Sequence, residues 1–266
     1  MSIKFEKWQG LGNDFIILTQ DSATGELAKK MCDRNFGVGA DGLFSPVKSN
    51  VADIGWKFFN SDGSSAQMCG NGIRCFAKYA RSNNLVNKDK FSVETLAGII
   101  TPELLNNGNV LVDMGIPVFD TAKIPVNADS YNSVVVQGFN AVAVSFGNPH
   151  CVIYCSEDSE IMAKSFGSSI ETDKMFPQKT NVEFVNVVSK DAIRVNVWER
   201  GCGITLACGT GACASVVAGV CQKLISNRVN VMLPGGNLNI FYDVDNSKHV
   251  FMEGPAEFVF SGEYFE

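Results

Sequence analysis

The sequence contains one short motif twice, and this repeat constrains the fold more than any other feature. Met68-Cys-Gly-Asn-Gly-Ile-Arg74 resembles Ala207-Cys-Gly-Thr-Gly-Ala-Cys213, and an apolar run with helical spacing follows each copy. Two further pairs keep the same order: Asn60 and Glu199 end strand-like runs before the two cysteines, and Gly12-Asn13 corresponds to Gly147-Asn148. One short match arises easily by chance, but three in register predict a duplicated domain with related sites in its two halves.

The remaining pattern predicts many strands and few helices, which is typical of an α+β fold in which each helix packs against a curved sheet. The strand-like runs, rich in β-branched and aromatic residues, are Phe15–Leu18, Ile54–Phe59, Val110–Asp113, Ser133–Gln137, Ala141–Phe146, Cys151–Tyr154, Val182–Val187, Ile193–Trp198, Leu238–Tyr242 and Glu257–Phe260. Helical spacing is clearest at Glu26–Cys32, Gly72–Asn83, Glu160–Ser165 and Gly211–Leu224.

The length of 266 residues favours about two domains, and the best linker begins at Met114-Gly-Ile-Pro-Val and continues as a polar stretch to Tyr131. We therefore expect one domain over residues 1–117 and a second over residues 118–253. A hydrophobic content of 45% excludes a disordered chain, and a net charge of −6 argues against a nucleic-acid-binding protein.

No membrane anchor or targeting signal is expected. The first residues carry lysine and glutamate and lack the apolar core of a signal peptide. The uncharged stretch Gly201–Gln222 is long enough to span a bilayer, but its glycines favour a loop that leads into a buried helix. We expect a soluble protein.

The sequence contains nine cysteines and only two histidines, so we considered whether the thiols form disulfides or bind a metal. The odd number and the missing signal argue against a disulfide framework, and the spacings do not favour a metal site. Cys75, Cys213 and Cys221 fall inside the expected helices and are interpreted as core residues.

Cys69 and Cys208 differ from these core cysteines because each lies just before a predicted helix. There the thiol lies beside free backbone N–H groups, and the flanking glycines let the backbone approach a ligand. The positive helix end lowers a thiol pKa by up to about 1.5 units, so either cysteine is a candidate base or nucleophile. The same N–H groups suit a carboxylate. His150 is a further candidate functional residue because it stands in the second Gly-Asn element. Glu199-Arg200 is suited to bind a charged amino acid, since arginine pairs with carboxylate and glutamate with ammonium.

At these residues the sequence resembles the diaminopimelate epimerase family. The motifs that carry the resemblance are Gly12-Asn-Asp-Phe15, Asn60-Ser-Asp-Gly63, Met68–Arg74, Gly147-Asn-Pro-His150, Thr180-Asn-Val182, Glu199-Arg-Gly201 and Ala207–Ala212, which span most of the chain. Two positions depart from the common pattern: Ile204 replaces a frequent glutamate, and Gly42 stands where some members carry a ligand-facing glutamine.

The resemblance implies two pseudo-symmetric lobes, each a mostly antiparallel curved sheet around a central helix, with residues 254–266 returning to the first lobe. It implies a cofactor-independent isomerase, without pyridoxal phosphate or metal, that converts LL-2,6-diaminopimelate to the meso form for lysine and peptidoglycan synthesis. The expected setting is a cytoplasmic homodimer with a small-molecule substrate and no nucleic-acid or membrane partner.

It also implies roles for single residues. Cys69 and Cys208 are the acid–base pair, and His150 and Glu199 tune the thiol pKa values. The substrate-binding residues are Asn13, Asn60, Gly70, Asn71, Asn148, Asn181, Glu199, Arg200, Gly209 and Thr210.

Other functions stay open on sequence grounds. A proline or hydroxyproline racemase shares the two-cysteine logic but usually has a histidine where Asn71 stands. A non-catalytic module would bind the amino acid without exchanging its α-hydrogen. A thiol-redox protein fits poorly, because the two cysteines are far apart in sequence.

Overall fold

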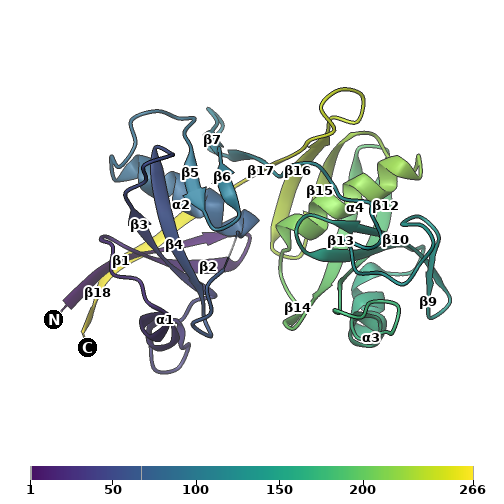
Figure 1. Ribbon diagram of the computed structural model, residues 1–266, viewed down its shortest axis with the longest axis horizontal. Helices are drawn as coiled ribbons and strands as arrows, with labels where there is room; N and C mark the ends of the chain where they lie inside the picture. Colours follow the sequence, from purple (N-terminus) through teal and green to yellow (C-terminus); the bar gives the residue numbers. More distant parts are fainter. Residues whose placement is uncertain (1, 67, 266) are drawn as a thin grey trace. The chain divides into compact units, whose positions relative to one another are not determined.

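The computed structural model describes residues 2–66 and 68–265 and divides into two units (Figure 1). Unit 1 continues to Val112 and resumes at Gly254, and unit 2 comprises Asp113–Glu253. The division lies a few residues before the expected boundary at 117. The reason is visible in the backbone, since the N–H of Met114 already donates to the Val250 carbonyl within unit 2, at 2.8 Å.

The sheet of unit 1 brings the two ends of the chain together. Its strand order is β18-β1-β2-β3-β4-β5-β6. Ser2 pairs with Phe265, so the first and last strands lie side by side (Figure 1). The elements of this unit are β1 (Ser2–Gly10), β2 (Asn13–Leu18), α1 (Gly25–Cys32), β3 (Gly42–Val47), β4 (Ile54–Asn60), α2 (Gly70–Ser82), β5 (Val93–Thr95), β6 (Gly98–Ile100), the hairpin of β7 (Glu103–Leu104) with β8 (Val110–Asp113), and β18 (Glu257–Phe265).

Unit 2 contains a sheet with the order β17-β16-β15-β13-β12-β11-β10-β9, with β14 paired to β13. Its elements are β9 (Val134–Val136), β10 (Phe139–Ser145), β11 (Pro149–Tyr154), α3 (Ser159–Glu171), β12 (Asn181–Ser189), β13 (Ala192–Glu199), β14 (Gly203–Ile204), α4 (Gly209–Cys221), β15 (Arg228–Leu233), β16 (Gly236–Tyr242) and β17 (Val250–Gly254).

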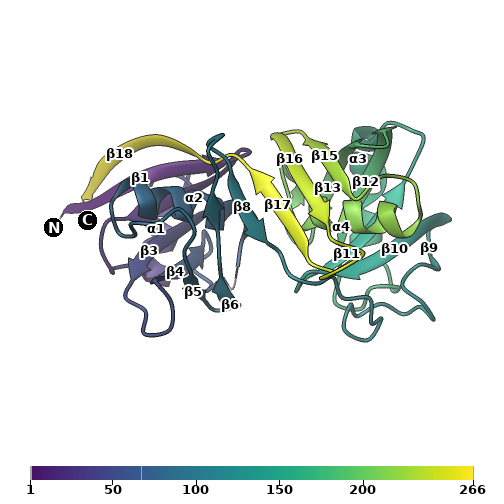
Figure 2. The same ribbon diagram turned by 90° about the horizontal axis from the view of Figure 1, so that it is seen from above.

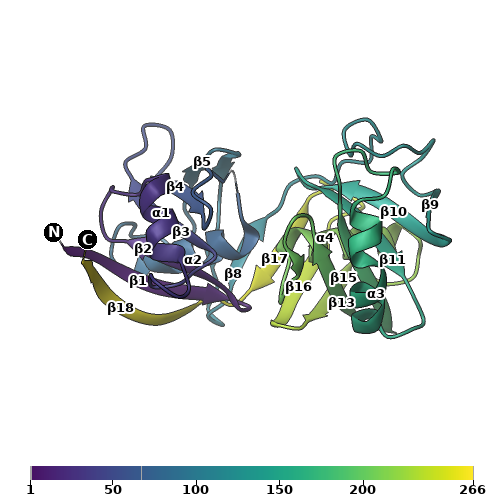
Figure 3. The ribbon, with the colours of Figure 1, turned by 90° about the horizontal axis from the view of Figure 1, so that it is seen from below.

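The two units repeat one topology. In unit 1, β1 to β6 pair successively as antiparallel, parallel, antiparallel, parallel and antiparallel neighbours. In unit 2, β10, β11, β12, β13, β15 and β16 pair in the same succession. The helices also correspond: α1 packs on β3 and β4 as α3 packs on β12 and β13 (Figure 3). The fold is therefore a mixed α/β duplication, as the internal sequence repeat predicts.

Each unit encloses one helix. Helix α2 contacts β1 and β2, and α4 contacts the corresponding β10 and β11 and also β16 (Figure 2). The sequence of α4 consists mainly of alanine, valine, glycine and cysteine, and a helix that is apolar all round is stable only when it is buried. Within the part of the chain that the structure describes, none of the helices has the length and apolar character needed to cross a membrane.

Aromatic side chains fix the position of α2. Phe44 of β3 stacks on Phe58 of β4, with ring centroids 4.2 Å apart, and Trp56 meets Phe76 of α2 edge-on at 5.4 Å. Such pairs contribute about 0.5–1.5 kcal/mol beyond the burial of their surface. Closely packed aromatic rings thus support the first turn of α2, which carries the motif residues.

The helices differ from the sequence prediction mainly at their ends. Helix α4 ends at Cys221 instead of Leu224, because Lys223 adopts the left-handed conformation with φ of 59°. Helix α3 continues past Ser165 to Glu171. The prediction also missed several strands, among them β1, β3, β15 and β17.

Candidate active site

Cys69 lies at the entrance of α2. It is the N-cap residue, with extended backbone angles, and its Sγ accepts a hydrogen bond from the N–H of Gly72 at 3.4 Å. The N–H groups of a first helical turn have no partner inside the helix, so the thiol and any anion beside it face ready donors.

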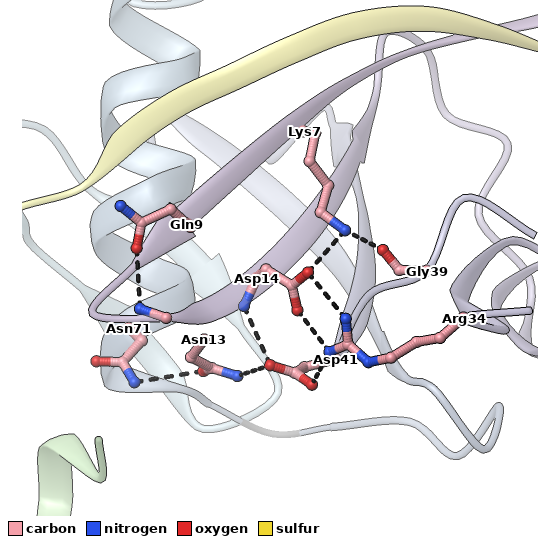
Figure 4. Close-up of polar contacts among 9 residues, drawn as sticks. Lys7, Gln9, Asn13, Asp14, Arg34, Gly39, Asp41 and Asn71 are labelled. Carbon is pink, nitrogen blue, oxygen red and sulfur yellow. Dashed lines mark hydrogen bonds and ion pairs between the residues drawn. The ribbon is translucent and has the colours of Figure 1, made fainter. Parts of the chain in front are cut away.

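A hydrogen-bonded pair of asparagines lies beside the Cys69 thiol. The Sγ lies 3.6 Å from Oδ1 of Asn13, which begins β2, and the same oxygen accepts from Nδ2 of Asn71 at 3.3 Å (Figure 4). Arg74, fully buried one turn into α2, donates to Oδ1 of Asn71 at 2.9 Å. The structure thus brings three of the predicted site residues into one hydrogen-bonded group in unit 1.

Cys208 occupies the equivalent position at the entrance of α4. It is the N-cap residue, its backbone is extended, and only 6% of it is exposed. Its Sγ lies 3.5 Å from the hydroxyl of Thr210. The two cysteines therefore have the same place in the duplicated topology, which the motif repeat predicts.

A chain of polar contacts leads from Cys208 into the core of unit 2. The Thr210 hydroxyl accepts from Nδ2 of Asn148 at 3.3 Å, and Oδ1 of Asn148 lies 3.1 Å from Nε2 of His150. The Nδ1 of His150 contacts Oε1 of Glu183 at 2.7 Å, and both of these side chains are completely buried. Glu183 and Asn148 hold the imidazole from both sides, so the ring has a single orientation.

The second glycine of each Cys-Gly-x-Gly motif is required by close packing. A Cβ at Gly72 would lie 2.6 Å from the ring of Phe44, and a Cβ at Gly211 would lie 2.7 Å from Oε1 of Glu183. Each would also approach the Cβ of its own motif cysteine to 3.3 Å. Real side chains do not tolerate such distances without displacing a neighbour.

The expected lowering of the thiol pKa is wrong for Cys208. Burial raises the pKa of this thiol well above its ordinary value, and the nearby carboxylates of Glu199 and Glu183 raise it further. The hydroxyl of Thr210 and the N–H of Gly211 act in the opposite direction but do not outweigh these effects. Desolvation therefore dominates over the helix end.

Glu199 is the carboxylate next to this thiol. Burial raises the pKa of Glu199, while the hydroxyl of Thr205, donating to Oε1 at 2.5 Å, favours the charged form. The thiol of Cys208 lies within hydrogen-bonding reach of the same carboxyl group and also favours its charged form. A carboxylate with a raised pKa beside a thiol is suited to exchange a proton with it.

Comparison with known proteins identifies the family that this chain resembles. A sequence model of the family described as "Diaminopimelate epimerase" matches residues 5–119 and 142–259. The diaminopimelate epimerase of Halothermothrix orenii is 47% identical over 99% of this chain and 98% of its own length. That of Carboxydothermus hydrogenoformans is also 47% identical, over 99% of this chain and 100% of its own.

The chain belongs to the diaminopimelate epimerase family. Solved structures of remote sequence share its fold. A PhzF-family phenazine biosynthesis protein of Bacillus anthracis has a TM-score of 0.71 at 16% identity and covers 100% of both chains. A hydroxyproline epimerase of Agrobacterium vitis has a TM-score of 0.70 at 10% identity and covers 98% of this chain and 92% of its own.

The other residues taken from the family motifs form contacts of their own, and Asn181 is the sheet partner of His150. In unit 2, the side chain of Asn181 donates to the carbonyl of Pro149 at 2.9 Å and accepts from the backbone N–H of Arg200 at 2.9 Å. The exposed guanidinium of Arg200 contacts the carbonyl of Gln178 at 3.4 Å. In unit 1, Asn60 ends β4 and donates to the hydroxyl of Ser64 at 3.0 Å.

The two glycines that follow the cysteines, Gly70 and Gly209, are the first residues of α2 and α4. Their position at the helix entrances is the one that the motif predicts for backbone contacts with a ligand.

Sequence reasoning missed Glu183 and Asp41. Glu183 stands in the apolar run Asn181-Val-Glu-Phe-Val185, where an isolated charge is a signal for a buried partner. Asp41 stands in Gly39-Ala-Asp-Gly42, where nothing in the local pattern distinguishes it from an ordinary loop residue.

The remaining helical cysteines separate into two kinds. Cys75 and Cys213 are buried as core residues, and burial raises the pKa of Cys75 to about 12. Cys221, which the sequence analysis also places in the core, is exposed at the last residue of α4. The core role predicted for Cys221 is therefore wrong, because this position of α4 faces away from the core.

Proposed function

We propose that this protein interconverts LL- and meso-2,6-diaminopimelate by acid–base chemistry of Cys69 and Cys208, in lysine and peptidoglycan synthesis. The observation that carries the proposal is the pair of cysteines at equivalent helix entrances, in a chain related over its whole length to diaminopimelate epimerases.

The reaction requires a base and an acid on opposite faces of one carbon atom. In each turnover, one cysteine as thiolate takes the α-hydrogen as a proton and becomes a thiol. The other cysteine gives its own proton to the opposite face and becomes the thiolate. The net charge of the pair is unchanged, and the stereocentre is inverted.

The intermediate between these steps carries the negative charge of an enediolate. An α-hydrogen next to a carboxylate is a very weak acid, so this charge needs fixed dipoles aimed at it. The free N–H groups at the entrances of α2 and α4, which include the backbone of Gly70 and Gly209, are suited to hold the carboxylate as charge develops.

The polar residues around the cysteines have two roles in this proposal. His150 and Glu199 adjust the proton affinity of the thiols. Binding of the substrate falls to Asn13, Asn60, Asn71, Asn148, Asn181, Glu199, Arg200 and Thr210. The exposed guanidinium of Arg200 is suited to the distal carboxylate, since arginine binds carboxylate through two parallel hydrogen bonds.

A proline-type racemase is the main competing function, since a hydroxyproline epimerase shares the fold. The presence of Asn71 at the α2 entrance favours the proposed substrate over this alternative. A non-catalytic binding module would not need paired thiols at both entrances.

A coupled assay tests the proposal. After exhaustive dialysis and treatment with a chelator, the protein should still convert LL- to meso-diaminopimelate, because the chemistry needs only its own side chains. L-Proline should not be racemised under the same conditions. Racemisation of proline without turnover of diaminopimelate, or activity that returns only with pyridoxal phosphate or zinc, would contradict it.

We also propose that the protein works in the cytoplasm as a homodimer, paired through β18. This strand lies at the edge of the unit 1 sheet, and its Phe258, Val259 and Phe260 are exposed. A long apolar edge strand is a template for pairing with a second chain. Sedimentation velocity should show a dimer that Val259→Glu shifts towards monomer, and a monomeric native protein would contradict this.

A further inference from the structure

A cluster of charged side chains lies behind Asn13 in unit 1 (Figure 4). Arg34 donates to both carboxylate oxygens of Asp14, at 3.2 and 2.8 Å, and to Oδ1 of Asp41 at 2.7 Å. Lys7, although buried, forms an ion pair with Asp14 at 2.8 Å. Burial alone would raise the pKa of Asp14, but the contacts with Arg34 and Lys7 outweigh it and leave the pKa below its ordinary value.

Asp41 connects this cluster to the site. Its Oδ1 is held by Arg34, and its Oδ2 accepts from the backbone N–H of Asp14 at 3.1 Å and from Nδ2 of Asn13 at 2.5 Å. An ionised carboxylate only accepts hydrogen bonds, so the side chain of Asn13 must turn its NH₂ group towards Asp41. The carbonyl oxygen of that amide then faces the other way, towards Cys69.

On its other side, Asn13 forms a longer hydrogen bond with Asn71, at 3.3 Å against 2.5 Å for Asp41, which favours the same orientation more weakly. Arg74 has only donors and contacts Oδ1 of Asn71, so Nδ2 of Asn71 points at Asn13 and donates to its Oδ1. A carboxylate on one side and an amide donor on the other thus leave a single orientation for the Asn13 amide.

We propose that Asp41 is a positioning residue that fixes the Asn13 amide so that its carbonyl oxygen faces Cys69 and holds this cysteine as the protonated thiol. A thiol donates to a carbonyl oxygen, whereas a thiolate has no proton to donate and is repelled by it. The inference deepens the proposed function and rests on it for the role of Cys69 as an acid. In the substrate-free protein, Asp41 thereby favours the thiol form of Cys69.

Other charged and titratable groups also lie near this thiol. Among the described residues, the cluster of Lys7, Asp14 and Arg34 is connected to Asn13 through Asp41, and the neighbours on α2 include Arg74 and the thiol of Cys75. The N–H of Gly72 favours the thiolate, so it opposes the effect of Asn13.

The variant Asp41→Asn tests the proposal, because an asparagine at this position both donates and accepts and no longer dictates which way Asn13 points. Its amide can then turn its NH₂ group to Cys69 and favour the thiolate. We expect the pH midpoint for carbamidomethylation of Cys69 to fall by about one unit, an increase of about tenfold in rate at neutral pH. Peptide mass spectrometry of the substrate-free protein measures it.

Two controls separate orientation from general damage. Asp21→Asn removes an exposed aspartate of the same unit, which pairs with Lys57, and should leave the Cys69 profile unchanged. In Asp41→Asn, the profile of Cys208 should also be unchanged. A Cys69 profile that overlays the native one in folded Asp41→Asn would overturn the proposal.

A second variant decides the matter even if Asp41→Asn fails to fold. Asn13→Ala removes the carbonyl acceptor and should lower the Cys69 midpoint by itself, and adding Asp41→Asn should cause no further change. An unchanged profile in Asn13→Ala, or an additive effect in the double variant, would refute the proposal. These readouts need no substrate, so a protein that passes them but does not epimerise diaminopimelate would contradict the proposed function alone.

Discussion

Cys69→Ala and Cys208→Ala are each expected to stop epimerisation of diaminopimelate. Each variant leaves one face of the substrate without an acid or base, and one positioned acid or base contributes about 10²–10⁴-fold to a rate. Because the reaction needs both groups in every turnover, kcat should fall by at least this factor in either variant and in both directions. The coupled assay from LL to meso and chiral chromatography from meso to LL measure it.

The matched controls are the cysteines six and five residues further along the same helices, Cys75 in α2 and Cys213 in α4. Cys75→Ala and Cys213→Ala remove fully buried thiols with the same change of atoms, so they should cost stability, about 1 kcal/mol each, and little activity. Epimerisation at a near-native rate in folded Cys69→Ala or Cys208→Ala would mean that the two-cysteine assignment is wrong.

Glu199→Gln should change activity and thiol reactivity in opposite directions. The Glu199 carboxylate raises the pKa of Cys208, so its neutral replacement should lower that pKa. Alkylation of Cys208 should then become about tenfold faster at a fixed pH below its midpoint, which corresponds to a shift of about one unit. Turnover should nevertheless fall by about 10²-fold or more, because the carboxylate that exchanges a proton with this thiol is lost.

The fold should survive this change, since a glutamine oxygen still accepts from the hydroxyl of Thr205. Glu160→Gln, an exposed glutamate of α3 that pairs with Lys164, is the control and should alter neither quantity. Slower alkylation of Cys208 in Glu199→Gln, or native turnover, would show that Glu199 does not act on this thiol.

The sequence predicts those parts of the fold that depend on local pattern. The run Val110–Asp113 coincides with β8, and the repeated motif locates both helix entrances. The strand β1 escaped prediction because Lys7 stands where the alternation of Ile3 and Phe5 calls for an apolar residue, and the pairing register shifts between Lys7 and Trp8. Its pairing with β18 joins the two ends of the chain, and no local pattern contains that information.

The site likewise contains residues that local sequence pattern predicts and residues that it does not. Cys69 and Cys208 can be predicted from the sequence because each stands in a Cys-Gly-x-Gly motif directly before a helical pattern. Asp41 and Glu183 act through contacts with Asn13 and His150, which are distant in sequence and meet only after the sheets form. The low pKa expected for the thiol at a helix end fails for Cys208 for the same reason, since burial depends on the whole unit.

Incorporation of deuterium during early turnover in heavy water tests the central claim most directly. If Cys69 and Cys208 serve opposite faces, the one that removes the α-hydrogen is never the one that delivers the new hydrogen, which comes from solvent. Mass spectrometry should therefore find deuterium in nearly all of the first product and almost none in the recovered substrate, starting from either isomer. Product that retains the original hydrogen, or equal labelling of both pools from the start, would show that a single base serves both faces and would contradict the two-cysteine mechanism.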